Sequence, residues 1–205
     1  MAVASIIIST VSLLLSIAVA VATLWHRGKL RMTPPKLIGF LYDPPGRDLK
    51  VFFRAALYAT GKRGHIVEAL YLRVRRGESS QTFDFWMYGE TKDLKIGSGL
   101  MVGDGGVVHN HHFLPPKDAS TFEFLAGEYV VETHATVVNR ATSVLLSTVH
   151  LFLSPELAAA LKDRTRGVFF TWRPESSCYA AHLQDSPPEP ISDFQKWAWH
   201  DSFRS

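Results

Sequence analysis

The chain has 205 residues, of which 46% are hydrophobic, and its 22 basic and 19 acidic side chains give a net charge of +3. It contains a single cysteine, Cys178, which excludes an intrachain disulfide and is typical of a reducing compartment. About 180 residues remain after the apolar N-terminus, which is enough for one domain with a sizeable core. Composition therefore excludes a disulfide-stabilised small scaffold and favours a single folded domain.

Residues 2–25 contain no charged side chain, no proline and no glycine. A helix over this stretch rises about 1.5 Å per residue and spans about 36 Å, which exceeds the roughly 30 Å of a bilayer core. A cleaved secretory signal is the alternative, but such signals begin with a basic region and have an apolar core of only about 7–15 residues. We therefore expect residues 1–26 to form a single transmembrane anchor.

Charge is distributed unevenly along the rest of the chain. Residues 27–76 carry 12 basic and 3 acidic side chains, whereas residues 77–205 carry 10 basic and 16 acidic ones. Because short basic flanks stay on the cytoplasmic side, we expect the N-terminus outside and the domain in the cytoplasm, at the inner membrane of a bacterial cell. The basic residues nearest the anchor form a predicted collar for anionic lipid of the cytoplasmic leaflet: Arg27, Lys29, Arg31 and Lys36.

Small hydroxyl residues recur on one face of the anchor, and we call them the hydroxyl row: Ser5, Ser9, Ser12, Ser16 and Thr23. Lipid provides no hydrophobic force between helices, so that close approach along small residues drives helix association. The row predicts a homo-oligomer formed through the anchor. In the alternative, each hydroxyl bonds to the carbonyl four residues earlier and the face contacts lipid.

Beyond the anchor, Thr33-Pro34-Pro35 predicts an extended spacer, so that residues 27–35 form a juxtamembrane linker. Short runs of alternating apolar residues then follow, separated by Gly, Pro, Asn and Asp, a pattern typical of an all-β sandwich or barrel. The predicted strands are residues 36–42, 49–58, 65–76, 81–88, 96–102, 107–114, 130–138, 143–153 and 168–172.

One short helix is expected late in the domain. Ser154 is a predicted N-cap, Pro155 occupies the first helical position and Glu156 supplies an early acid. These signals place the helix at residues 155–164, inside a sandwich domain that we expect over residues 36–173.

The remaining residues, 174–205, are predicted to be a tail. Three prolines between residues 184 and 190 are typical of a linker, and Ser192 and Gln195 have the spacing of a capping box. The short helix that this spacing predicts is rich in aromatic residues. We expect it to pack on its own domain, with a protein partner or the membrane interface as alternatives.

Gly127 and then Tyr129, at the start of an alternating strand, are similar to the corner of immunoglobulin-like sandwiches, where a tyrosine hydroxyl bonds back to the backbone. The whole chain is thus predicted to be mainly β, with an N-terminal transmembrane helix, an antiparallel β-sandwich of the immunoglobulin-like or a similar type, and a short C-terminal helix. This organisation resembles that of bacterial single-pass proteins that carry a small soluble β-domain.

The most suggestive cluster for metal binding is His109, His111 and His112. Neutral imidazoles bind zinc, and residues i and i+2 of a strand point to one face. However, no cysteine or carboxylate stands near them at a recognised ligand spacing. We interpret them as polar residues of a strand, and we predict no catalytic residue and no cofactor.

A second candidate site is a basic and aromatic patch. Tyr71, Arg73, Arg75 and Trp86 would offer an acidic partner or a lipid headgroup a surface for cation–π contacts, and the tail adds Phe194, Trp197 and Trp199. Nucleic acid is not expected, because the arginines stand singly and no nucleic-acid-binding module is visible.

The expected function is a non-enzymatic adaptor that holds a protein partner at the cytoplasmic face of the membrane. The alternatives are a metal-dependent enzyme or sensor around the histidines and a module that binds anionic lipid.

Overall fold

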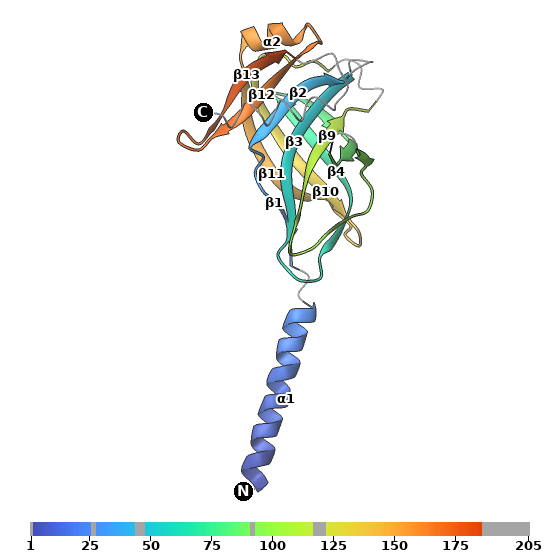
Figure 1. Ribbon diagram of the computed structural model, residues 1–205, viewed down its shortest axis with the longest axis vertical. Helices are drawn as coiled ribbons and strands as arrows, with labels where there is room; N and C mark the ends of the chain where they lie inside the picture. Colours follow the sequence, from blue (N-terminus) through green and yellow to red (C-terminus); the bar gives the residue numbers. More distant parts are fainter. Residues whose placement is uncertain (1, 26–27, 44–47, 91–92, 117–121, 186–205) are drawn as a thin grey trace.

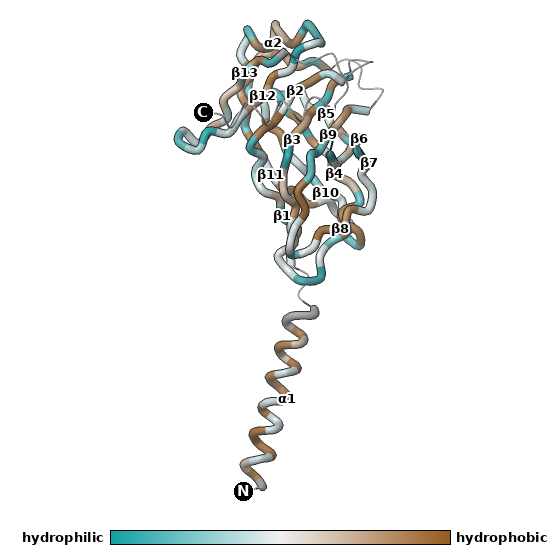
Figure 2. The backbone as a smooth tube through the Cα atoms, viewed as in Figure 1, coloured by the Kyte–Doolittle hydropathy of each residue, from teal (hydrophilic) through white to brown (hydrophobic). Residues whose placement is uncertain are grey.

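A computed structural model describes residues 2–25, 28–43, 48–90, 93–116 and 122–185 (Figure 1). The apolar helix α1 (Ala2–Trp25) projects from one end of a β-domain and packs against none of it (Figure 1). Figure 2 shows the contrast: apolar residues dominate the whole length of α1, whereas polar residues alternate with them over the strands. Hydropathy alone thus divides the chain into a helix and a domain.

The domain contains two antiparallel sheets. Sheet A has eight strands, in the order β13 (Cys178–Asp185), β12 (Arg166–Arg173), β2 (Leu37–Asp43), β3 (Asp48–Ala59), β9 (Val107–Leu114), β6 (Phe85–Tyr88) and β7 (Lys95–Ile96), with β1 (Leu30–Met32) also paired to β3. Sheet B has five, in the order β11 (Val144–Leu153), β10 (Gly127–Val137), β4 (His65–Arg76) and β5 (Ser79–Phe83), with β8 (Leu100–Val102) also paired to β4.

The core lies between the two sheets, and the long strands β4 and β10 of sheet B alternate buried residues with more exposed ones. Leu70, Leu72 and Val74 of β4 are fully buried, as the alternation predicted, and belong to the same apolar cluster as the buried side chains of β3. Within this core, Phe40 stacks on Phe124, with 4.3 Å between ring centroids. The predicted mainly β, antiparallel sandwich is confirmed.

The corner tyrosine is also confirmed. The buried Tyr129 donates a hydrogen bond from its hydroxyl to the carbonyl oxygen of Leu125, over 2.5 Å. Burial raises the pKa of this phenol to about 12, so that the hydroxyl remains a donor at physiological pH. The contact ties the start of β10 to the chain that leads into it.

The strands β10 and β11 pair in regular antiparallel register over the first half of the hairpin. Tyr129, Val131 and Thr133 stand opposite Leu151, Val149 and Ser147, respectively. The register then shifts between Thr133 and His134, so that His134 pairs with Leu145 and Ala135 with Val144.

The strand predicted over residues 81–88 is wrong. It is divided at Asp84 into β5, which belongs to sheet B, and β6, which belongs to sheet A. The crossing changes which residues face the core: Trp86 is 2% exposed, whereas Phe85 is 44% exposed. The strand predicted over residues 96–102 is divided in the same way, into β7 and β8.

Both predicted ends of the domain differ from the structure. The expected linker, residues 27–35, contains β1, which pairs with β3. The domain also continues beyond residue 173, because Cys178–Asp185 form β13 along the edge of β12. Between them, α2 (Pro155–Leu161) lies within the range predicted for the helix, with Ser154 as its N-cap.

Candidate functional site

The anchor helix contains a stretch of 19 residues, Val3–Val21, that is long and apolar enough to cross a membrane, and none of it is buried by the domain. An uncleaved anchor and a signal sequence both fit this finding. Two members of the hydroxyl row, Ser9 and Ser16, donate hydrogen bonds to the carbonyl oxygens of Ser5 and Ser12, over 2.9 and 2.8 Å. Their hydroxyls are therefore satisfied within the helix, and association through the row remains a prediction.

The basic collar is only partly assembled at the anchor. Lys29 lies at the near end of the domain, where its N–H donates to the Thr60 hydroxyl over 2.7 Å. Lys36 lies about 17 Å farther along the sheet at about 3.4 Å per residue, just before β2, and its ammonium stands 5.6 Å from the centre of the Trp172 ring. The sheet thus separates Lys36 from Lys29, contact of the collar with anionic lipid remains a prediction, and Arg27 is outside the described residues.

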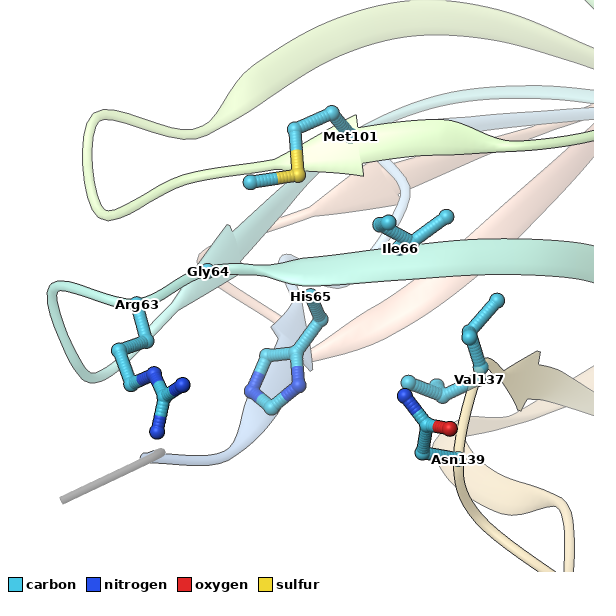
Figure 3. Close-up of a pocket in the computed structure, with 8 residues that line it drawn as sticks. Arg63, Gly64, His65, Ile66, Met101, Val137 and Asn139 are labelled. Carbon is cyan, nitrogen blue, oxygen red and sulfur yellow. The ribbon is translucent and has the colours of Figure 1, made fainter. Parts of the chain in front are cut away.

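The turn between β3 and β4 adds two basic residues, Lys62 and Arg63, to the anchor end of the domain, although they are distant from α1 in sequence. The backbone of Thr60 bonds back to Lys29, and this brings Lys62 and Arg63 to the end of the domain from which α1 projects (Figure 1). Next to this turn is a hollow of about 260 Å³, lined by Arg63, Gly64, His65, Ile66, Met101, Val137, Val138 and Asn139 (Figure 3). Its rim is partly apolar, because Ile66 and Met101 are 43% and 56% exposed.

The three candidate metal-binding histidines do not converge. His109 and His111 pair with Ala55 and Phe53, so they share one face of sheet A, as predicted. That face is the inner one, and His111 is fully buried, so their interpretation as polar-face residues of a strand is wrong. His112 pairs with Phe52 and points to the outer face. Within the described residues, no group of three or more His, Cys, Asp or Glu side chains is placed to hold a metal ion.

Burial keeps two of these imidazoles neutral. It lowers the pKa of His111 to about 3, with a smaller contribution from His109, and that of His112 to about 2, with a smaller contribution from Lys50. Trp86 donates from its indole nitrogen to Nδ1 of His111 over 3.2 Å. Trp86 therefore belongs to the core beside His111, and its assignment to a surface patch is wrong.

The other members of the predicted patch share the outer face of sheet B. Tyr71, Arg73 and Arg75 alternate along β4, and β10 places Glu132 and His134 beside them. Arg75 bonds to Glu132 over 2.7 Å, and Arg73 lies 3.9 Å from the same carboxylate.

An aromatic pair adjoins the two arginines. The Tyr71 and His134 rings stack with centroids 4.9 Å apart and an interplanar angle of 5°. The Tyr71 hydroxyl also lies 2.9 Å from the Ser143 hydroxyl. These contacts fix Tyr71, Arg73, Arg75, Glu132 and His134 as one cluster, which we call the arginine face.

Pairing of β4 with β10 assembles the arginine face, and the sequence of β4 alone therefore gives no sign of Glu132 and His134. The only signal in the sequence was their i, i+2 spacing on an alternating strand. The three aromatic residues assigned to the tail, Phe194, Trp197 and Trp199, are outside the described residues.

No protein-family model matches the chain, and no curated protein matches it. Among solved structures, the chain is similar to the CooA pilin subunit from enterotoxigenic Escherichia coli, with 10% sequence identity and a TM-score of 0.31. The similarity covers 62% of this chain and 99% of that chain. A match at this level carries no argument about function, which must be inferred from the surfaces described above.

Proposed function

We propose that this chain is a non-enzymatic, single-pass membrane protein whose sandwich binds a protein partner at the cytoplasmic face of the membrane. Anchoring is supported by α1, which is apolar and free of contacts with the domain. The cytoplasmic orientation is supported by Lys29 and Arg31, which follow closely after α1, because basic residues flanking a membrane helix stay in the cytoplasm.

The arginine face is the proposed partner site. Arg73 and Arg75 are 47% and 46% exposed at their side chains, yet both are held by one carboxylate, Glu132, which is 16% exposed. Two guanidinium groups against one carboxylate leave an excess positive charge. This ordered, solvent-facing arginine pair is the observation that supports the proposal.

The chemistry of the arginine face favours an acidic peptide segment. An exposed guanidinium still has free N–H groups that can donate to a carboxylate of the partner, and such charge-assisted bonds are stronger than neutral ones. The stacked Tyr71 ring provides a flat surface of the kind enriched at interfaces. Exposed Leu145 and Phe152 on the neighbouring strand β11 add apolar contact area.

In-cell photo-crosslinking tests the proposal, with the photoreactive residue at position 148 of the full-length chain. Thr148 is exposed and stands opposite Glu132. We expect a discrete crosslinked protein that is lost in the Arg73→Glu, Arg75→Glu variant. It should persist in Arg173→Glu, which reverses an exposed charge on sheet A. The proposal is wrong if the same crosslinks form in all three chains.

A second candidate function, binding of anionic lipid, is favoured by the anchor end of the domain. There Lys62 and Arg63 adjoin the partly apolar rim formed by Ile66 and Met101. Basic and apolar side chains together are the composition of a surface that binds a lipid headgroup layer.

Lipid binding can be tested with a polarity-sensitive dye at Met101→Cys, in a chain whose Cys178 is replaced by Ser. In nanodiscs, this candidate function predicts a blue-shifted emission with anionic lipid that disappears after Lys62→Glu, Arg63→Glu. The same label at position 152, on the outer face of sheet B, is the control. Equal emission from the label at position 101 in anionic and zwitterionic nanodiscs would exclude the binding of anionic lipid by this surface.

A further inference from the structure

A second cavity lies beside α2, at the end of the domain opposite α1 (Figure 1). Its volume is about 490 Å³, within the range of about 300–1,000 Å³ that is typical of small-molecule sites. Its walls come from the end of β2, from the chain that leads into β10, and from α2. It shares no lining residue with the arginine face or with the hollow at the turn between β3 and β4, and so it is a separate candidate site.

One side of α2 bounds the cavity. Pro155, Ala158, Ala159 and Lys162 line it, at the spacing that places residues on one side of a helix. The helix begins at this point because Ser154 is its N-cap. Two alanines and a proline give this side of α2 little bulk. The helix therefore forms a wall of the cavity without filling it.

Two aromatic rings form an apolar corner in the cavity. The rings of Tyr42 and Phe124 have centroids 6.4 Å apart and an interplanar angle of 73°. Phe124 is 2% exposed and is held by its stack on Phe40, and Leu161 of α2 lines the same cavity. A third ring placed between two nearly perpendicular rings can stack on one and contact the edge of the other. The corner is thus suited to an aromatic side chain.

Opposite charges stand beside this corner. The guanidinium carbon of Arg164 lies 5.7 Å from the centre of the Tyr42 ring. Burial raises the pKa of the Tyr42 phenol, while the charge of Arg164 lowers it and that of Glu123 raises it, so that both charges act on one hydroxyl. Glu123 and Arg164 both line the cavity, and among the described residues neither is engaged in an ion pair. Both remain available to a ligand.

This arrangement matches a ligand that carries both charges. The planar guanidinium of Arg164 is suited to a carboxylate, and the Glu123 carboxylate can accept hydrogen bonds from an ammonium group. A ligand with only a carboxylate would leave Glu123 near a like charge, and one with only an ammonium would do the same at Arg164. Lys162 gives the wall a second positive charge, which adds to the attraction for a carboxylate.

We propose that this cavity binds a free aromatic α-amino acid, with its ring between Tyr42 and Phe124, its carboxylate at Arg164 and its ammonium at Glu123. Because α2 lies at the end of the domain opposite the anchor, the ligand enters from the aqueous phase and not from the bilayer. The site is independent of the proposed binding of a protein partner at the arginine face.

Fluorine NMR of para-fluoro-L-phenylalanine tests this site, with the full-length chain in zwitterionic nanodiscs. Two matched analogues each lack one charge: para-fluorophenylpropanoate has no ammonium and para-fluorophenethylamine has no carboxylate. We expect saturable line broadening by the amino acid below about 10 mM, the range that a ligand of this size requires. Each analogue should bind about tenfold more weakly, because it loses a hydrogen bond between charged groups.

Two charge-neutral variants assign the ends of the ligand. Arg164→Gln should weaken binding of the amino acid about tenfold without weakening that of the amine, and Glu123→Gln should weaken binding of the amino acid about tenfold without weakening that of the propanoate. Both side chains are exposed, so that these variants should keep the fold. The control is Arg140→Gln, in the turn between β10 and β11, which should leave all three affinities unchanged.

Three results would overturn the proposal. The first is the absence of saturable binding of the amino acid by about 10 mM. The second is an analogue that binds as tightly as the amino acid, since one charge would then suffice. The third is an unchanged affinity for the amino acid in either Arg164→Gln or Glu123→Gln, since the ligand would then lie elsewhere.

Discussion

Replacing Tyr129 with Phe removes one hydrogen bond and leaves the packing of the ring in place. The Tyr129 hydroxyl is the donor to the Leu125 carbonyl over 2.5 Å, and the side chain is fully buried. A typical hydrogen bond contributes about 1 kcal/mol, and an unsatisfied buried group adds about 1–3 kcal/mol. Leu125 is 40% exposed, and we expect water to replace the lost donor, so that the lower end applies. We expect a loss of about 1.5 kcal/mol in the free energy of unfolding.

The assay is urea unfolding of the full-length chain in detergent micelles, followed by tryptophan fluorescence. For a domain of this size the loss corresponds to a decrease in Tm of about 3–6 °C. The control is Tyr58→Phe, because Tyr58 is 37% exposed and its replacement should change stability by less than about 0.5 kcal/mol. If both variants unfold at the same urea concentration as the wild type, the corner tyrosine does not stabilise the fold as argued.

Three further predictions concern other parts of the molecule. Gly167→Ala should destabilise the domain by about 1–3 kcal/mol in the same assay, because its Cβ would overlap Leu41, and Leu41→Ala in the same chain should relieve part of the loss. The free energy of unfolding should fall as the pH decreases from about 6.5 toward 3. The reason is that His111 and His112 bind protons in the unfolded chain but remain neutral in the folded protein, where their pKa values are about 3 and 2. An unchanged urea midpoint between pH 7 and pH 4 would contradict this. Replacing Ser9, Ser12 and Ser16 with Leu should reduce the crosslinked dimer in membranes at least severalfold, and an unchanged dimer would remove the hydroxyl row as an association surface.

Local periodicity was sufficient to predict much of the fold. The strands β4 and β9 begin and end at the residues that alternation indicated, and Tyr129 occupies the corner that its place after Gly127 suggested. Local periodicity did not predict the break at Asp84, because the apolar alternation continues there although the chain passes from one sheet to the other. Which of Phe85 and Trp86 is buried depends on pairing with β9, a long-range contact that no local pattern records.

The strand β13 was missed for a related reason. Residues 178–185 contain Ala180, Ala181 and His182, which have little intrinsic preference for a strand. Their conformation depends on β12, whose Trp172 and Phe170 stand opposite Tyr179 and Ala181.

The candidate site could be predicted only in part. Alternation along β4 placed Tyr71, Arg73 and Arg75 on one face, but the partners Glu132 and His134 lie about sixty residues away in sequence and depend on sheet order. Lys36 is the converse case: it is close to the anchor in sequence but distant from it along the sheet.

The topology of the chain can be measured directly, because Cys178 is the single cysteine and is exposed at the start of β13. Intact cells that express the full-length chain would be treated with a maleimide that cannot cross the inner membrane, before and after permeabilisation. A domain anchored on the cytoplasmic side predicts labelling only after permeabilisation. Labelling of Cys178 in intact cells would contradict the proposed adaptor at the cytoplasmic face.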